Sequence, residues 1–110
     1  MVRKEHFSKK ETALNKLIEE ALVDCYTEDE QHEAFAVMLE DHLPCPFRAR
    51  ILGEEVQVCQ FNREGRGSVV AICRYRGRRY RINATAIEWI GAPLKGSQWL
   101  EAYREWLGGP

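Results

Sequence analysis

Two prolines near the middle of the chain, Pro44 and Pro46, separate two parts that have different hydrophobic periods. Proline has no backbone N–H and keeps the residue before it out of helical geometry, so a helix cannot continue through this point. Before the prolines, apolar residues recur at the spacing of a helical turn, and after Phe47 they alternate as in a strand. The sequence therefore predicts helices first and a sheet second.

The first part predicts two helices, over 11–24 and from Thr27 to about His42. The first range has an apolar stripe opposite its charged residues, which is the pattern of an amphipathic helix. Thr27 and Glu30 match a capping box, so they mark the start of the second helix. Residues 1–10 are basic and polar, and we expect them to be disordered. The residues expected to face the core are Leu14, Leu17, Ile18, Ala21 and Leu22, followed by Phe35, Met38 and Leu39.

The second part predicts a small antiparallel sheet and a last helix. The segments that alternate or run apolar are separated by glycine-containing turns, which are too short for the crossover helices of a parallel sheet. We expect this sheet to curl into an SH3-like barrel. Ser97 is expected to cap a helix over 97–107. The strands are expected at 47–52, 55–61, 68–75 and 79–83, with 86–90 as a candidate fifth strand.

The predicted fold class is α+β: two N-terminal helices, a small antiparallel SH3-like sheet or barrel, and a C-terminal helix. At 110 residues the chain is expected to form one domain, with a helical part at 11–43 and a β part at 46–90. No apolar run approaches the roughly 18 residues that span a bilayer, and the charged N-terminus lacks the apolar stretch of a signal peptide. We therefore expect a cytoplasmic protein that does not bind membranes.

Charge is distributed unevenly along a chain whose net charge is only −1. Residues 1–45 hold eleven acids and five bases, a net of −6, whereas residues 46–110 hold six acids and eleven bases, a net of +5. The cysteines form no Cys-x-x-Cys pair, so we expect neither a zinc site nor a disulfide framework, and the thiols should be free. The acidic helical part is the first candidate for a binding site.

The acids of the second helix can be divided into two local clusters. Glu30 and Asp41 would lie about 16 Å apart along a helix axis, whereas calcium–oxygen distances are about 2.3–2.6 Å, so one ion cannot bind both. One cluster would gather Asp24, Glu28 and Glu30, with Asp29, at the break between the helices. The other would use Glu40 and Asp41, with carbonyl groups at the helix end and Glu54 or Glu55. Oxygen ligands without paired cysteines or histidines favour calcium over zinc or copper.

The same acids also have a simpler interpretation as a solvated helix face. Acids in a first turn complement the helix dipole, and the capping box already accounts for Glu30. The Glu40–Asp41 end has no such explanation and is therefore the stronger candidate on sequence grounds.

Several segments, taken in order, resemble the calcium-binding protein family typified by cyanobacterial CcbP. They are Asp24-Cys-Tyr-Thr-Glu-Asp-Glu-Gln, Phe35, Leu39-Glu-Asp-His-Leu-Pro-Cys-Pro-Phe and Gly53-Glu-Glu-Val. The resemblance covers residues 18–60 closely and the later strands more loosely. It implies a small cytoplasmic buffer or sensor that binds calcium through acidic side chains outside any EF-hand. The acids that match are Asp24, Glu28, Glu30, Glu40 and Asp41.

The chain departs from this family in two ways. Members often have an acid where this chain has Thr27, and those typical of calcium binding are acidic overall, whereas the β part here is basic. Both differences predict a weaker calcium site than is usual in the family.

An arginine-rich hairpin is the second candidate site. Arginine with interleaved tyrosine suits the phosphates and bases of nucleic acid, or an acidic partner. Arginines that are solvated, or paired with the acidic helix, are the simpler explanation, and we do not expect nucleic acid to be the partner. A protein partner and the oligomeric state are left open. No catalytic triad, nucleophile elbow or phosphate loop is present, so we expect no enzyme activity. The arginines are Arg74, Arg76, Arg78, Arg79 and Arg81.

Overall fold

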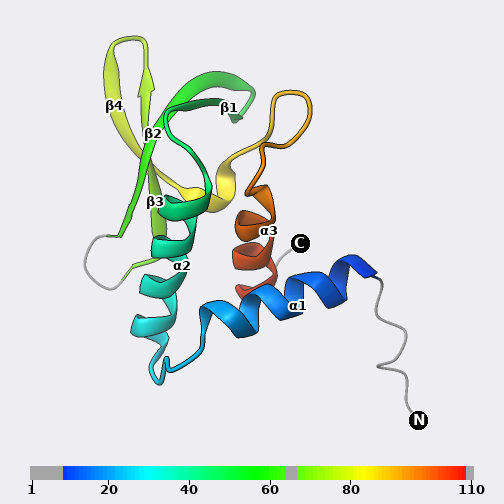
Figure 1. Ribbon diagram of the computed structural model, residues 1–110. Helices are drawn as coiled ribbons and strands as arrows, with labels where there is room; N and C mark the ends of the chain where they lie inside the picture. Colours follow the sequence, from blue (N-terminus) through cyan, green and yellow to red (C-terminus); the bar gives the residue numbers. More distant parts are fainter. Residues whose placement is uncertain (1–8, 64–66, 109–110) are drawn as a thin grey trace.

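The computed structural model describes residues 9–63 and 67–108, and it confirms the α+β class (Figure 1). Two helices come first, then a four-stranded antiparallel sheet, then a last helix. No helix among the described residues is both long and apolar enough to cross a membrane. The elements are α1 (Lys9–Ala21), α2 (Glu28–His42), β1 (Phe47–Ile51), β2 (Glu54–Arg63), β3 (Val69–Tyr75), β4 (Arg78–Asn83), η2 (Ala84–Ala86) and α3 (Ser97–Trp106).

The α1 helix begins and ends earlier than the sequence predicted. It already includes Lys9 and Lys10, whereas the rest of the segment expected to be disordered lies outside the described residues. It ends at Ala21, and the chain then turns through Asp24, whose φ of 64° is left-handed. An aspartate tolerates this conformation better than most residues, which allows the sharp reversal between α1 and α2.

The predicted capping box at the start of α2 is confirmed. The Thr27 hydroxyl accepts a hydrogen bond from the Glu30 backbone N–H at 3.1 Å, and the Glu30 carboxylate accepts one from the Thr27 backbone N–H at 3.1 Å. Phe35 and Leu39 are fully buried, and Met38 packs against the core from a half-buried position. The helix ends at His42, just before the two prolines.

The sheet has the linear order β1-β2-β3-β4, with every neighbouring pair antiparallel. A bulge in β2 between Val58 and Gln60 shifts its register against β3. One face packs on the helices and carries the buried residues Val58, Phe61 and Ala71. The four predicted strands are confirmed to within a few residues, whereas closure into an SH3-like barrel stays a prediction.

The candidate fifth strand at 86–90 is wrong. The chain forms the 3₁₀ turn η2, because the Asn83 side chain accepts a hydrogen bond from the Thr85 backbone N–H at 3.1 Å and turns the backbone. The guanidinium of Arg104 then binds the Thr85 carbonyl at 3.0 Å. Only an isolated bridge between Arg50 and Glu88 remains of the expected pairing.

The start of α3 also differs from the prediction. Gly96, not Ser97, occupies the N-cap position, with φ of 96° and no side-chain capping bond. A Cβ atom at Gly96 would overlap the carbonyl oxygen of His42 at the end of α2. The close approach of α2 and α3 therefore requires glycine here.

The three helices and the sheet share one core (Figure 1). The α3 helix packs against both α1 and α2, and α2 also packs on β2 and β3. The β3–β4 hairpin extends away from the helices at one end of the molecule, and the α1–α2 turn lies at the other end. The acidic turn and the arginine-rich hairpin are thus well separated.

Replacing Gly96 tests this packing. We expect Gly96→Ala to reduce the free energy of unfolding by about 2–5 kcal/mol, because it adds overlap with His42 to the strain of a left-handed residue. Gly91→Ala is the matched control, since Gly91 also has positive φ but has open space around it. It should cost only about 1–2 kcal/mol. Urea unfolding of both variants measures the difference, and equal losses would contradict the proposed overlap.

Candidate metal centre

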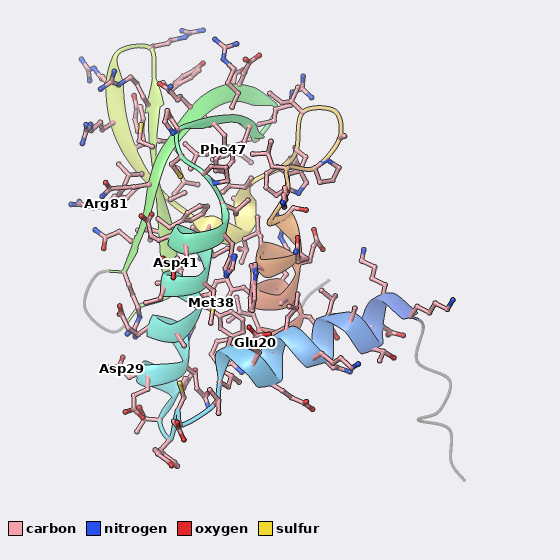
Figure 2. All side chains as sticks on the ribbon, in the orientation of Figure 1. Glu20, Asp29, Met38, Asp41, Phe47 and Arg81 are labelled. Atoms are coloured by element: carbon pink, nitrogen blue, oxygen red, sulfur yellow. The ribbon has the colours of Figure 1, made fainter. Side chains whose placement is uncertain are left out.

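The acids identified from the sequence lie in two separate places, around the two ends of α2. Asp24, Glu28 and Glu30 lie in or beside the α1–α2 turn, and Glu40 and Asp41 lie in the last turn of the helix. Figure 2 labels Asp29 and Asp41, which mark these two ends. The prediction that one ion could not reach both clusters agrees with this arrangement.

At the first end, the capping interaction folds the Glu30 side chain back toward the turn. Its Oε1 atom accepts hydrogen bonds from the backbone N–H groups of Tyr26 at 2.8 Å and Thr27 at 3.1 Å. The Thr27 hydroxyl donates to the same oxygen at 3.4 Å. This places a carboxylate next to the turn that holds Asp24, and these three hydrogen bonds all use its Oε1 atom.

Glu28 is tied to a buried polar network. Its carboxylate lies 3.8 Å from Nε2 of His32, whose Nδ1 lies 2.9 Å from the hydroxyl of Tyr103. The Tyr103 oxygen also accepts the Val69 backbone N–H at 3.0 Å, so one hydroxyl connects α2, α3 and β3. The Glu28 side chain itself is 82% exposed, so its carboxylate stays accessible to an ion.

Arg63, which the sequence did not single out, neutralises part of the acidic helix. Its side chain is 5% exposed and forms ion pairs with Asp29 and, at 3.7 Å, with Glu33. Its guanidinium also donates to the Asp29 carbonyl at 3.0 Å and to the Gly67 carbonyl at 2.8 Å. In the sequence, the only sign of these ion pairs was the spacing of Asp29 and Glu33 by one helical turn, because Arg63 lies far from both along the chain.

At the second end, Glu40 points to the sheet. Its carboxylate accepts a hydrogen bond from the backbone N–H of Phe61, beyond the bulge in β2. It also lies close enough to the Cys45 thiol to help raise the pKa of that thiol to about 11, although burial contributes more. Asp41 is exposed and forms no hydrogen bond or ion pair within the described part of the chain.

The extra ligands predicted for this second cluster do not reach it. Glu54 accepts a hydrogen bond from the Tyr75 hydroxyl at 2.6 Å, and Glu55 pairs with Arg48, both at the far end of β2. The carbonyl of His42 faces Gly96 at the start of α3. The prediction that Glu54 or Glu55 joins Glu40 and Asp41 is therefore wrong, because Glu40 contacts β2 at Phe61, whereas Glu54 and Glu55 lie at the other end of that strand.

Neither end holds a finished metal site within the described part of the chain. No group of three or more cysteine, histidine, aspartate or glutamate side chains is placed to hold an ion there. The available donors are nevertheless carboxylate oxygens, which suit calcium, and calcium accepts flexible geometry and completes its shell with carbonyls and water. The exposed carboxylates would have to move toward a bound ion.

The arginine-rich hairpin lies at the opposite end of the molecule from the α1–α2 turn (Figure 1). Arg63, which lies outside the hairpin, forms ion pairs with Asp29 and Glu33 of α2, and the Arg76 guanidinium lies 5.1 Å above the Tyr75 ring. Tyr80 is 42% exposed, because the end of the sheet extends beyond the helices. All four cysteines are free, as predicted.

Comparison with known proteins gives a consistent result. A family model for calcium binding, that of the CcbP proteins, matches residues 15–107. The crystal structure of CcbP from Anabaena superposes with a TM-score of 0.77 and 17% identity, over 99% of this chain and 94% of that one. A calcium-binding protein in its calcium-binding form gives a TM-score of 0.75 and 18% identity, over 93% of this chain and 96% of that one. At these identities the structural likeness shows the fold. No curated protein matches the chain.

The environment of Cys45 gives a test of where Glu40 lies. Because burial and the Glu40 carboxylate raise the pKa of this thiol to about 11, we expect slow alkylation near neutral pH and faster alkylation as the pH rises. Glu40→Gln removes one negative charge and should lower the pKa, so alkylation should accelerate. Mass spectrometry after iodoacetamide treatment measures the rate, with urea-unfolded protein as the reference. Equal rates in Glu40→Gln and the parent protein would contradict the contact.

Proposed function

We infer the function from the family. The chain belongs to the CcbP family of calcium-binding proteins, and it is a small protein that binds Ca²⁺. The family is not known for catalysis, and we propose that this chain acts without it, as a calcium buffer or sensor. Free thiols on all four cysteines support a cytoplasmic location. The nucleic-acid alternative is not favoured by the family.

We propose the α1–α2 turn as the primary calcium site, with Asp24, Glu28 and Glu30 as ligands. The observation that carries this proposal is the capping interaction, which brings the Glu30 carboxylate back to the turn beside Asp24 while leaving its Oε2 atom for an ion. The exposed carboxylate of Glu28 lies in the adjacent first helical turn. Backbone carbonyls of the turn and water would complete the oxygen shell that calcium prefers.

Glu40 and Asp41 are proposed as a second, weaker site. Glu40 already accepts the Phe61 N–H, and Glu54 and Glu55 are engaged elsewhere, so Asp41 is the main exposed carboxylate available. An ion with so few protein ligands keeps most of its water and binds weakly. This reverses the order of preference that the sequence alone suggested.

Calorimetric titration with calcium tests the primary site through substitutions that preserve the fold. Asp24→Asn keeps a residue that tolerates positive φ, and Glu30→Gln keeps an oxygen for the capping box, but each removes a negative charge. We expect each of these, and Glu28→Gln, to weaken calcium binding by roughly tenfold, about 1.4 kcal/mol. Asp41→Asn should change the affinity of the tighter site little.

Glu20→Gln is the matched control, since Glu20 is an exposed acid of α1 and the substitution removes the same charge. It should leave the affinity unchanged. Calcium binding lost only in Asp41→Asn would move the primary site to the other end of α2. Absence of binding below millimolar calcium by the parent protein would overturn the calcium function itself.

Terbium luminescence locates the bound ion independently of the calorimetric titration. Tyr26 is 84% exposed and lies between Asp24 and Glu28 in sequence, so it should sensitise the emission of a terbium ion bound at the turn. We expect Tyr26→Leu to remove most of the sensitised emission while leaving calcium affinity close to that of the parent. Emission that persists in Tyr26→Leu would place the ion near another aromatic residue.

A further inference from the structure

The inner face of the sheet leaves an apolar groove open at the end beyond the helices. The groove has a volume of about 260 Å³. Tyr80 is 42% exposed and Leu52 is 93% exposed, although both are apolar residues at this end of the sheet. A groove of this size suits a side chain or two and is smaller than the usual site for a small molecule. It is lined by Ile51, Leu52, Val56, Tyr75, Tyr80 and Ile82, with Glu54 and Cys73.

The outer face of the same end carries a row of arginines. In the strand register, Arg48 lies opposite Gln57, Gln57 opposite Arg74, and Arg74 opposite Arg79. Like charges placed directly opposite each other destabilise a sheet, and Arg74 and Arg79 form such a pair. Arg48, on the edge strand β1 at the opposite edge of the sheet from β4, has a carboxylate partner in Glu55. An anion bound beside Arg74 and Arg79 would relieve their repulsion.

These two faces meet at the edge strand β4. It is the last strand of the sheet, and within the described residues its strand partner is β3. Arg76 and Gly77 both have positive φ and form a two-residue turn, so Tyr75 and Arg78 are a hydrogen-bonded pair and the pattern then alternates. The backbone N–H of Tyr80 therefore faces β3, whereas that of Arg79 faces the outer edge.

We propose that β4 is a docking edge for an extended segment of a partner protein in which acidic and apolar side chains alternate. A strand added to this edge presents successive side chains to opposite faces of the sheet. Its apolar side chains would lie beside Tyr80 and Ile82 at the groove, and its acidic side chains would lie on the opposite face, beside Arg79. Only a segment with this alternation would place acidic side chains beside the arginines of one face and apolar side chains beside the groove of the other.

The register disfavours a second copy of this chain as the occupant. Pairing β4 with the β4 strand of another copy would bring the outer-face arginines of both copies together, which is repulsive. Nucleic acid would satisfy the arginines but not the aliphatic groove formed by Ile51, Val56 and Ile82. The acidic turn at the other end also opposes a polyanion. An acidic and apolar peptide is the occupant that both faces favour.

Fluorescence anisotropy with a labelled peptide of sequence Glu-Leu-Glu-Val-Glu-Leu-Glu tests the proposal. We expect this peptide to bind the parent protein, and Arg79→Glu or Tyr80→Ser to weaken binding by roughly tenfold or more. Lys16→Glu is the matched control, because it makes the same change in charge on exposed α1 and should leave binding unchanged. A peptide of the same composition with its acids grouped together, Glu-Glu-Glu-Glu-Leu-Val-Leu, should bind much more weakly.

Hydrogen exchange distinguishes strand addition from simple charge attraction. The outward amide of Arg79 should exchange more slowly when the alternating peptide is bound, whereas the Tyr80 amide, already bonded to β3, should change little. Absence of peptide binding would overturn the proposal and leave the arginines as charges that keep an edge strand from aggregating. Equal binding of the grouped peptide, or tighter binding of single-stranded oligothymidylate, would also overturn it.

Discussion

The hydroxyl group of Tyr103 joins the three parts of the fold. It lies on α3, is fully buried, accepts the Val69 backbone N–H of β3 and contacts Nδ1 of His32 on α2. Burial raises the pKa of this phenol, while the hydrogen bonds from Val69 and Ser68 and the charge of Arg63 lower it. A tyrosine hydroxyl is protonated at neutral pH, so this group can accept from Val69 while it bonds to His32. A phenylalanine here would leave the Val69 N–H without a partner in the core, at a cost of about 1–3 kcal/mol.

This network also limits what the acidic turn can do. The Nε2 atom of His32 lies 3.8 Å from the Glu28 carboxylate, and Trp106 packs edge-on against the same ring. The first turn of α2 is thus held from inside by α3 and from the sheet side by Arg63. A calcium ion at the α1–α2 turn would be bound by carboxylate side chains that can move, on a backbone that is held in place. Such a site gains little from pre-organisation, which agrees with the reduced affinity expected from Thr27 and from the basic β part.

Local interactions made much of the fold predictable, and contacts between distant residues account for most of the errors. The capping box of Thr27 and Glu30 involves neighbours in sequence, so its pattern was sufficient. Gly96 is required by the carbonyl of His42, which is distant in sequence. The turn η2 combines the local bond of Asn83 to Thr85 with the contact from the distant Arg104. The candidate metal centre shows the same difference between local and distant contacts. The acids of α2 could be found from their spacing, but the ion pairs of Arg63 and the bond from Phe61 to Glu40 could not.

The two proposed binding regions cannot influence each other through charge alone. The α2 helix has 15 residues and is therefore about 22 Å long, and the arginine-rich hairpin lies beyond its far end (Figure 1). Electrostatic interactions across solvent are largely screened beyond about 8 Å at physiological ionic strength. A calcium signal from the α1–α2 turn could reach the sheet only through packed contacts. Arg63 and Glu40 provide two such contacts, since each connects α2 to β2, and β2 leads through β3 to the edge strand. Coupling between calcium and a bound peptide would therefore depend on movement of α2 against β2.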